Sequence, residues 1–364
     1  MNKKILVLIK IYKGDLNPFD ECALECALSL KNADVSVLAM SPLSFKPVLE
    51  KLTRLGVNSY LVSDIKYAQS DTISTSYILS NAIKLINPDV VFAGRQSVDG
   101  NTAQVPLMLS KLLDFELINK VVDFDFDSEE MLLRDGQHAL IKSKQIITFE
   151  KFKLLRSPSI FSKTKEVNII SNEILKLDDG KIGQLGSPTQ VIKTYQNEKE
   201  RRFAKFISYE TLDNIVDISL KKDRSYCYEK INKAPCIFYI GDIKEIAKKY
   251  GEIIIELKVD ALSLSQVIDL ISKERPQIIL WEENDKYKLL ASQVAIETGN
   301  GLCADCSSFN YLNGKFIMTR PTLGGDLLAD IISTSPISMA TVRKISSSNE
   351  VAITVGKGAI KYLD

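Results

Sequence analysis

The stretch best suited to chemistry spans residues 94–106, which read Gly-Arg-Gln-Ser-Val-Asp-Gly-Asn-Thr-Ala-Gln-Val-Pro. A mostly apolar pattern typical of a strand precedes it at residues 89–93, and an amphipathic pattern typical of a helix follows at residues 107–113. The first amides of a helix have no intrahelical partner and carry partial positive charge. A strand that ends in glycine, turns and enters a helix can therefore hold an anionic ligand.

Three residues in this stretch refine the interpretation. Arg95 adds a positive charge at the end of the strand, and Gly100 allows a sharp turn. Pro106 lacks an N–H and fits only in the first turn of a helix, which predicts a helix start between Thr102 and Gln104. The spacing alone is equally consistent with an ordinary strand–turn–helix connection, because short glycine-containing loops are common.

Two further stretches have the residues of a helix start. Asn17 is a suitable N-cap, Pro18 suits the first helical position and Asp20 lies in the first turn, where acidic residues are favoured. Asp71 is a suitable N-cap for another helix, which we expect to end near Leu85. Taken alone, both stretches are sufficiently explained as helix starts.

The elements that must position these residues alternate between strands and helices. The strands are apolar runs without a period of two, which predicts a parallel sheet covered by helices on both faces. We expect them at residues 4–12, 35–40, 58–63 and 89–93. A ligand of such a sheet lies beyond the carboxyl ends of its strands. Residues 8–10, Met40 and residues 94–105 all fall at such ends.

At these residues the sequence resembles the electron transfer flavoprotein beta subunit. Residues 94–106 are similar to its nucleotide-binding loop, Gly-Arg/Lys-Gln-Ala-Ile-Asp-Gly-Asp-Thr-Ala-Gln-Val-Gly, with departures at Ser97, Val98, Asn101 and Pro106. Residues 17–30 match a second family signature, Asn-Pro-Phe-Asp-Glu-x-Ala-x-Glu-x-Ala-x-x-Leu, at every fixed position. Residues 71–75 resemble a third motif, which the family places near the nucleotide phosphates.

The resemblance implies an adenine-nucleotide site. The loop around Asn101 looks more like family members that bind FAD here than like the Asp-Asp-Asp type that binds AMP, so FAD is expected and AMP is the alternative. The implied cofactor-binding residues are Leu8, Asn17, Pro18, Phe19, Asp20, Met40, Asp71, Thr75, Gly94, Arg95, Gln96, Asp99, Gly100, Asn101, Thr102, Ala103, Gln104 and Val105.

The second half of the chain shows another α/β pattern. Strands are expected at residues 235–241, 252–258 and 276–282, with helices near 242–250, 263–274 and 286–298. The segments Arg-Pro-x-x-Gly-Gly at residues 320–325 and Met-Ala-Thr-Val-Arg at 339–343 resemble the first domain of the electron transfer flavoprotein alpha subunit. The flavin-binding domain that follows in that subunit is expected to be missing.

The implied fold is two similar α/β domains, residues 1–205 and 206–364, each a parallel sheet with helices on both faces. This is the adenine nucleotide alpha hydrolase-like architecture, with the two domains related by a pseudo-two-fold axis. Residues 118–150 alternate and are expected to form an antiparallel meander. Residues 154–165 occupy the region that in the family projects and docks on partner dehydrogenases.

Composition excludes several other classes of protein. The net charge of +1 gives no electrostatic reason to expect nucleic acid or an anionic membrane as a partner. No apolar stretch approaches membrane-spanning length, and the cytoplasm is the expected location. Cys303 and Cys306 form a lone CxxC without a second ligand pair, and the only histidine, His138, lies in a strand pattern. No metal site is therefore expected.

Three classes of function remain in view. The first is a component of an electron transfer flavoprotein system, working with a separate flavoprotein or an acyl-CoA-dehydrogenase-type partner. The second is a scaffold that binds an adenine nucleotide without redox activity, and nucleotide hydrolysis is a weaker third. No residue is placed for acid–base or nucleophilic catalysis, so redox chemistry would belong to the flavin.

Overall fold

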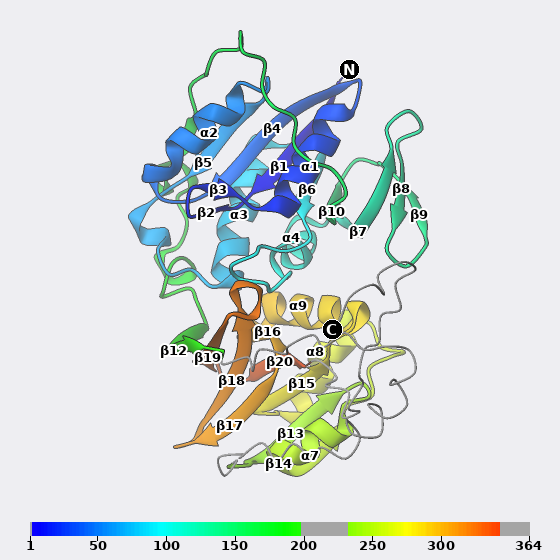
Figure 1. Ribbon diagram of the computed structural model, residues 1–364. Helices are drawn as coiled ribbons and strands as arrows, with labels where there is room; N and C mark the ends of the chain where they lie inside the picture. The colour runs from blue at the N-terminus through cyan, green and yellow to red at the C-terminus, as the bar shows by residue number, and fades with distance from the viewer. Residues whose placement is uncertain (1, 198–231, 343–364) are drawn as a thin grey trace, which may run out of the picture.

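The computed structural model describes residues 2–197 and 232–342 (Figure 1). Within these residues the chain forms one nine-stranded sheet in its N-terminal half and one five-stranded sheet in its C-terminal half, stacked one above the other in Figure 1. A four-stranded sheet and a two-stranded hairpin complete the β-structure. The expected α/β class is thereby confirmed. No helix of these two segments is long and apolar enough to cross a bilayer.

The N-terminal sheet is parallel over most of its width. Its strands are β1 (Lys3–Ile9), β4 (Ala33–Met40), β5 (Asn58–Val62), β6 (Val90–Gly94), β7 (Glu116–Asp125), β8 (Glu130–Leu133), β9 (His138–Leu140), β10 (Gln145–Phe149) and β11 (Asn168–Ile170). They lie in the order β11-β5-β4-β1-β6-β10-β7-β8-β9. All pairs from β11 to β7 are parallel, whereas β8 and β9 add an antiparallel edge.

The expected meander at residues 118–150 is only partly correct. β7, β8 and β9 are antiparallel, but β10 lies between β6 and β7 and pairs in parallel with both. All five residues of β10 are buried. Its polar residues are satisfied across the sheet, because Gln145 donates to Glu116 and Thr148 donates to Asn119. The polar residues of β10, which suggested a strand with one face in solvent, are therefore buried and hydrogen-bonded.

Helices cover both faces of this sheet, as expected. They are α1 (Pro18–Ser29), α2 (Lys46–Thr53), α3 (Thr72–Ile86), α4 (Val105–Leu113) and the short α5 (Asn172–Leu175). α1 and α2 pack on one face, where Leu24 and Leu49 are fully buried. α3 and α4 pack on the other, where Ile78 and Leu109 are fully buried. The small hairpin of β2 (Ile11–Tyr12) and β3 (Asp15–Leu16) joins β1 to α1.

The C-terminal half repeats the layered arrangement. Its parallel strands are β13 (Ala234–Ile240), β14 (Gly251–Glu256), β15 (Ile278–Glu282), β16 (Leu302–Cys306) and β20 (Ser338–Val342). They lie in the order β14-β13-β15-β20-β16. Its helices are α7 (Lys244–Tyr250), α8 (Leu264–Glu274) and α9 (Asp285–Thr298). α7 contributes to the core on one face, whereas α8 and α9 contribute to the core on the other.

A four-stranded antiparallel sheet links the two halves. Its strands are β12 (Thr189–Gln196), β17 (Ser308–Leu312), β18 (Lys315–Thr322) and β19 (Leu327–Ser333), in the order β12-β19-β18-β17. β12 therefore lies within the expected first domain in sequence but pairs with strands of the second half. The expected boundary between residues 205 and 206 lies outside the residues that the structure describes.

The two halves also meet through their helices. α4 of the first half packs against α9 of the second. Met108 of α4 is fully buried in the same core as Ile279 and Trp281 of β15. At the edge of this contact, the Lys111 amine lies 2.8 Å from the Glu297 carboxylate. An apolar core thus spans the junction between the two halves.

Candidate functional site

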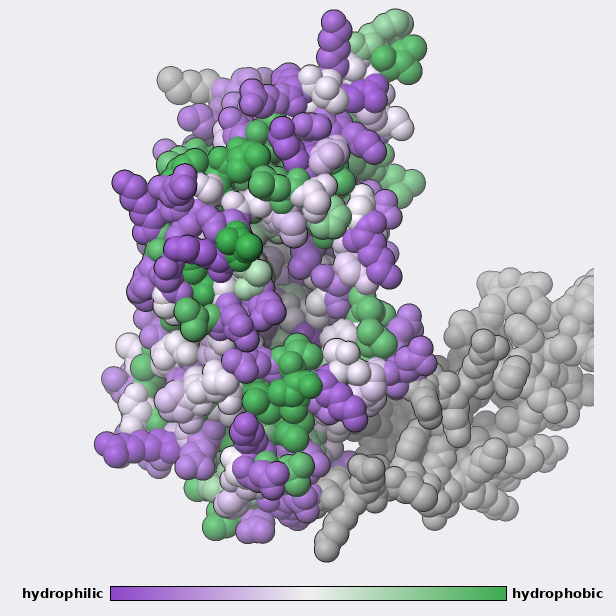
Figure 2. Space-filling view, turned by 90° about the vertical axis from the view of Figure 1, so that its left-hand side faces the viewer, coloured by the Kyte–Doolittle hydropathy of each residue, from purple (hydrophilic) through white to green (hydrophobic). Residues whose placement is uncertain are grey.

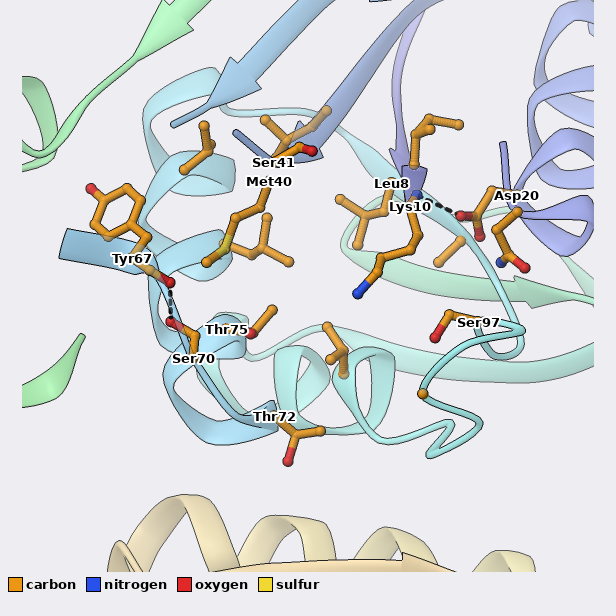
Figure 3. A pocket seen from close by; sticks show the side chains of 18 of the residues that line it. Leu8, Lys10, Asp20, Met40, Ser41, Tyr67, Ser70, Thr72, Thr75 and Ser97 are labelled. Carbon is orange, nitrogen blue, oxygen red and sulfur yellow. Dashed lines mark hydrogen bonds between the residues drawn. The ribbon is translucent and has the colours of Figure 1, made fainter. Parts of the chain in front are cut away.

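A cavity of about 930 Å³ opens at the carboxyl ends of β1, β4, β5 and β6. The starts of α3 and α4 form its opposite wall, and α9 lies beneath them (Figure 3). The surface in Figure 2 is hollowed near its centre, with apolar side chains beside the hollow. Parallel α/β sheets bind ligands at this edge, so topology alone marks the cavity as the candidate site.

Most of the residues implied by the resemblance line this cavity. They come from five separate stretches of the chain, which the parallel sheet brings to one edge. Those that line it are Leu8, Asn17, Asp20, Met40, Asp71, Thr75, Gly94, Gln96, Gly100, Thr102, Ala103, Gln104 and Val105.

The other implied residues, Pro18, Phe19, Arg95, Asp99 and Asn101, do not line the cavity. The Arg95 guanidinium lies over the Phe19 ring at 5.2 Å, and its Nε is 2.8 Å from Glu150 Oε1. The positive charge that Arg95 was expected to add at the strand end is present, but it is paired with Glu150. Asp99 Oδ2 lies 3.3 Å from the Lys10 amine at the cavity. Pro18 is the first residue of α1. Asn101 has a left-handed backbone conformation in the loop before α4.

The Asp20 carboxyl group holds three elements together. It lies on α1 and is 5% exposed. Its Oδ2 accepts from the Lys10 amide at 2.7 Å and its Oδ1 accepts from the Gly94 amide at 3.0 Å, which ties α1 to the ends of β1 and β6. Burial raises the pKa of Asp20 to about 7, although both hydrogen bonds oppose that rise.

The close packing of α1 against the end of β6 explains why residue 94 is a glycine. A Cβ at this position would lie 2.6 Å from the Cβ of Phe19 and nearer still to Asp20 Oδ1. Any other residue would therefore push α1 away from the strand end. The close approach of helix and strand is what places Asp20 between the two strands.

Asn17 occupies the N-cap position of α1, but its side chain does not cap the helix. The Asp20 amide bonds to the Asn17 backbone carbonyl at 2.9 Å instead. The Asn17 Nδ2 donates to the Gln96 carbonyl at 2.8 Å and so binds the loop after β6. The expected side-chain cap is therefore wrong, because the amide of Asn17 serves a contact between two distant motifs.

Asp71 caps α3 as expected. Its Oδ1 accepts from the amides of Ile73 and Ser74 at 2.9 and 3.0 Å. Its Oδ2 accepts from the Thr189 amide at 3.0 Å and from the Thr189 hydroxyl at 2.7 Å. Protein donors thus occupy both carboxylate oxygens at the cavity wall.

The loop before α4 carries the strongest sign of a ligand. Asn101 and Ala103 have φ values of 57° and 50°, a left-handed conformation that costs energy for residues other than glycine. α4 begins at Val105, one residue after the expected interval, and its N-cap Gln104 makes no side-chain cap. The helix therefore presents uncapped amides and the positive end of its dipole to the cavity.

Some buried polar atoms at this wall have no hydrogen-bond partner among the residues that the structure describes. Gln104 is 1% exposed, and both its Oε1 and its Nε2 are without a hydrogen bond. The Oδ1 of Asn17 is also buried and unpaired. Buried amides normally find partners because leaving them unpaired costs about 1–3 kcal/mol. A donor and acceptors facing an apolar cavity fit a ligand with polar edges, such as a purine or a flavin.

No motif in the sequence indicated the wall formed by residues 62–70. Tyr67, Ser70 and Ser41 line the cavity there, together with Lys10 and Ser97 (Figure 3). Ser41 and the 62–70 segment directly follow β4 and the end of β5. Their position at the carboxyl ends of expected strands was the available signal. Residue types alone do not separate them from ordinary loop residues.

The fold and this site define a class, an α/β protein with a ligand cavity at the carboxyl edge of a parallel sheet. The family is more specific. The chain matches the electron transfer flavoprotein domain over residues 5–144 and 259–364. The matched residues are most of the chain, and the chain belongs to the electron transfer flavoprotein family.

Individual relatives agree with this assignment. The electron transfer flavoprotein subunit beta of Thermoanaerobacterium thermosaccharolyticum is 32% identical over 202 residues, which cover 51% of this chain and 77% of that protein. The subunit beta of Clostridium acetobutylicum is 28% identical over 233 residues, covering 60% and 86%. A caffeyl-CoA reductase-Etf complex subunit, CarD of Acetobacterium woodii, is 29% identical over 197 residues, covering 50% and 75%.

Proposed function

We propose that this chain is an electron transfer flavoprotein component that binds an adenine nucleotide in the cavity of its N-terminal half. The observation that carries the proposal is the unpaired amide of Gln104, buried at the wall of a cavity otherwise rich in apolar side chains. The uncapped start of α4 supports a phosphate nearby. Membership of the electron transfer flavoprotein family supports an adenine nucleotide as the ligand.

The size and shape of the cavity favour FAD over AMP. Small-molecule pockets typically measure ~300–1,000 Å³, so about 930 Å³ is near the upper end of that range. The cavity extends from Asn17 and Gln104 across the ends of the strands to Tyr67 and Leu43. A ligand longer than a mononucleotide is needed to cover this span. FAD would supply electron acceptance and release, and the protein would supply orientation and an apolar surrounding.

A partner that exchanges electrons with the flavin is the second part of the proposal. One relative is named as a subunit of a caffeyl-CoA reductase complex, and we infer a dehydrogenase or a separate flavoprotein for this chain. The segment after β10 suits such a contact, because Leu154, Ile160 and Phe161 are 84–89% exposed. It projects at the top of Figure 1, and hydrophobic side chains also gather at the top of Figure 2. Arg54 holds it in place by donating to two of its carbonyls.

The first test is the visible absorption spectrum of the purified chain, with mass analysis of the released ligand. A yellow protein that releases FAD supports the proposal. A colourless protein that releases AMP supports the scaffold alternative instead. A chain that neither retains nor binds any adenine nucleotide contradicts both.

The second test is Gln104→Leu, with Gln137→Leu on the exposed β8–β9 turn as the matched control. Leucine removes an unpaired buried amide, so the ligand-free variant is expected to be more stable by about 1 kcal/mol or more. The same change removes hydrogen bonds to the ligand, so nucleotide binding is expected to weaken by at least about tenfold. Urea unfolding and calorimetric titration measure the two effects. A variant that loses stability and retains full affinity would contradict this role of Gln104.

A further inference from the structure

The cavity contains a single basic side chain among the described residues that line it, Lys10 at the end of β1. Its amine points toward the middle of the cavity, above the start of α4 (Figure 3). The side chain is about half exposed, at 51%, and its ion-pair contact is with Asp99 Oδ2 at 3.3 Å. Ion pairs that are this exposed contribute little to stability. Lys10 can therefore exchange its partner at small cost.

The other charged groups of the cavity are already satisfied. Asp20 accepts hydrogen bonds from two backbone amides. Asp71 accepts from three backbone amides and from the Thr189 hydroxyl. Asp64 accepts from the amides of Lys66 and Asn172. Carboxylates held in this way by protein donors do not compete strongly for a cation. The Lys10 amine is thus the charged group in this wall that is left for a ligand.

Groups of its own loop act on the Asp99 carboxylate besides Lys10. Burial would raise the pKa of Asp99, but the Lys10 charge, together with the Ser97 hydroxyl and the Gly100 amide, holds that pKa below its usual value. Lys10 is therefore one of three groups that favour the ionised form of Asp99. The contact with Asp99 is therefore the position of the Lys10 amine in the ligand-free protein.

The positive features of the cavity converge on one place. Ala103, which has a left-handed conformation, and the uncapped start of α4 line the same cavity as Lys10. Backbone amides at such a turn, a helix N-terminus and an amine together form a site for a dianionic phosphate. The apolar wall at Met40 and Leu79 offers no comparable place for charge.

We propose that Lys10 is the cation that recognises the nucleotide phosphate, exchanging Asp99 for phosphate oxygens when the ligand binds. This inference rests on the proposed function and adds a specificity-determining residue to it. Lys10 then distinguishes a phosphorylated nucleotide from the corresponding nucleoside. It contributes charge to the phosphate end of the ligand and leaves recognition of the base to Gln104 and Asn17.

The experiment titrates ligand-free protein calorimetrically with AMP and, separately, with adenosine. The variants are Lys10→Met and Lys10→Arg, and Lys13→Met in the exposed β2–β3 turn is the matched control. Lys10→Met is expected to weaken AMP binding by about tenfold or more and to leave adenosine binding within about twofold. Lys10→Arg and Lys13→Met are expected to stay within about threefold of wild type for both ligands.

Two results would overturn the inference while leaving the proposed function intact. One is unchanged AMP affinity in Lys10→Met, and the other is an equal loss of AMP and adenosine affinity, which would mean that Lys10 only shapes the cavity. A wild-type chain that binds neither AMP, adenosine nor FAD would overturn the proposed function itself. A second readout is the salt dependence of AMP binding, which should be steeper in wild type than in Lys10→Met because screening weakens the ion contact.

Discussion

Asp20 shows how one residue can serve both the fold and the site. Its carboxyl group bonds the ends of β1 and β6, and its pKa is raised by burial from 3.8 to about 7. In the unfolded chain Asp20 ionises near its usual pKa. Between about pH 4 and pH 7 the folded state therefore holds a proton that the unfolded state has lost. The stability contributed by this proton is complete below that window and is lost as the pH rises through it.

We therefore expect the free energy of unfolding of wild type to fall, relative to that of Asp20→Asn, as the pH rises from about 4 to about 7. Asparagine does not titrate, so the difference between the two proteins isolates this group from all others. Urea unfolding at a series of pH values measures it. Parallel curves for the two proteins would mean that Asp20 ionises at an ordinary pKa in the folded state.

At the scale of elements, the start of α3 is shared between the two halves. Asp71 caps the helix with one oxygen and accepts from Thr189 of β12 with the other. β12 belongs to the sheet that also contains β18 and β19. The Leu323 amide donates to the carbonyl of Asp99, in the loop before α4, at 3.1 Å. Strands of the linking sheet and its turn thus brace the cavity at two points.

Thr189→Val is expected to lower the free energy of unfolding by about 1.5 kcal/mol or more, because it removes a hydrogen bond to a charged acceptor. Thr189→Ser keeps the hydroxyl and should restore most of that loss. The control is Thr194→Val on the exposed part of the same strand, which should stay within about 0.5 kcal/mol of wild type. Equal losses in the valine and serine variants would show that the hydroxyl is not the stabilising group.

At the scale of the whole molecule, the contact between α4 and α9 couples the two halves. Met108 is fully buried in a core built mainly from the second half, although α4 starts at the cavity of the first half. Met108 lies three residues after Val105, which lines the cavity. We infer that loss of packing here would affect both the cohesion of the halves and the cavity.

Met108→Ala is expected to destabilise the chain by about 2–5 kcal/mol through loss of apolar contact and a residual void. Trp281, the only tryptophan, is buried in the same core and reports on the second half by its fluorescence. We expect fluorescence and far-ultraviolet circular dichroism to give one unfolding transition in wild type and separate transitions in the alanine variant. Met108→Leu conserves volume and should change stability by less than about 1.5 kcal/mol. Coincident transitions in Met108→Ala would argue against coupling through this contact.

Much of the architecture was accessible from local patterns. The strands and helices of both halves lie within a few residues of their expected positions, and Asp71 caps α3 as its type suggests. Membership of the family followed from three motifs in the right order. The carboxyl-edge cavity followed from strand order in parallel sheets. These inferences succeed because burial periodicity, helix capping and motif spacing depend on residues that are close in the sequence.

Contacts between distant segments were decided by the tertiary structure alone. Asn17 and Gln96 are 79 positions apart, and the sequence offered no reason to replace a helix cap with that bond. Arg95 is paired with Glu150, and the basic side chain that the structure places at the cavity is Lys10, which contacts Asp99. β10 entered the centre of the sheet because its polar residues found partners on β7. A side chain's role is set by which partners lie within hydrogen-bonding distance, and that depends on the path of the whole chain, whereas its residue type fixes only what it can donate, accept or neutralise.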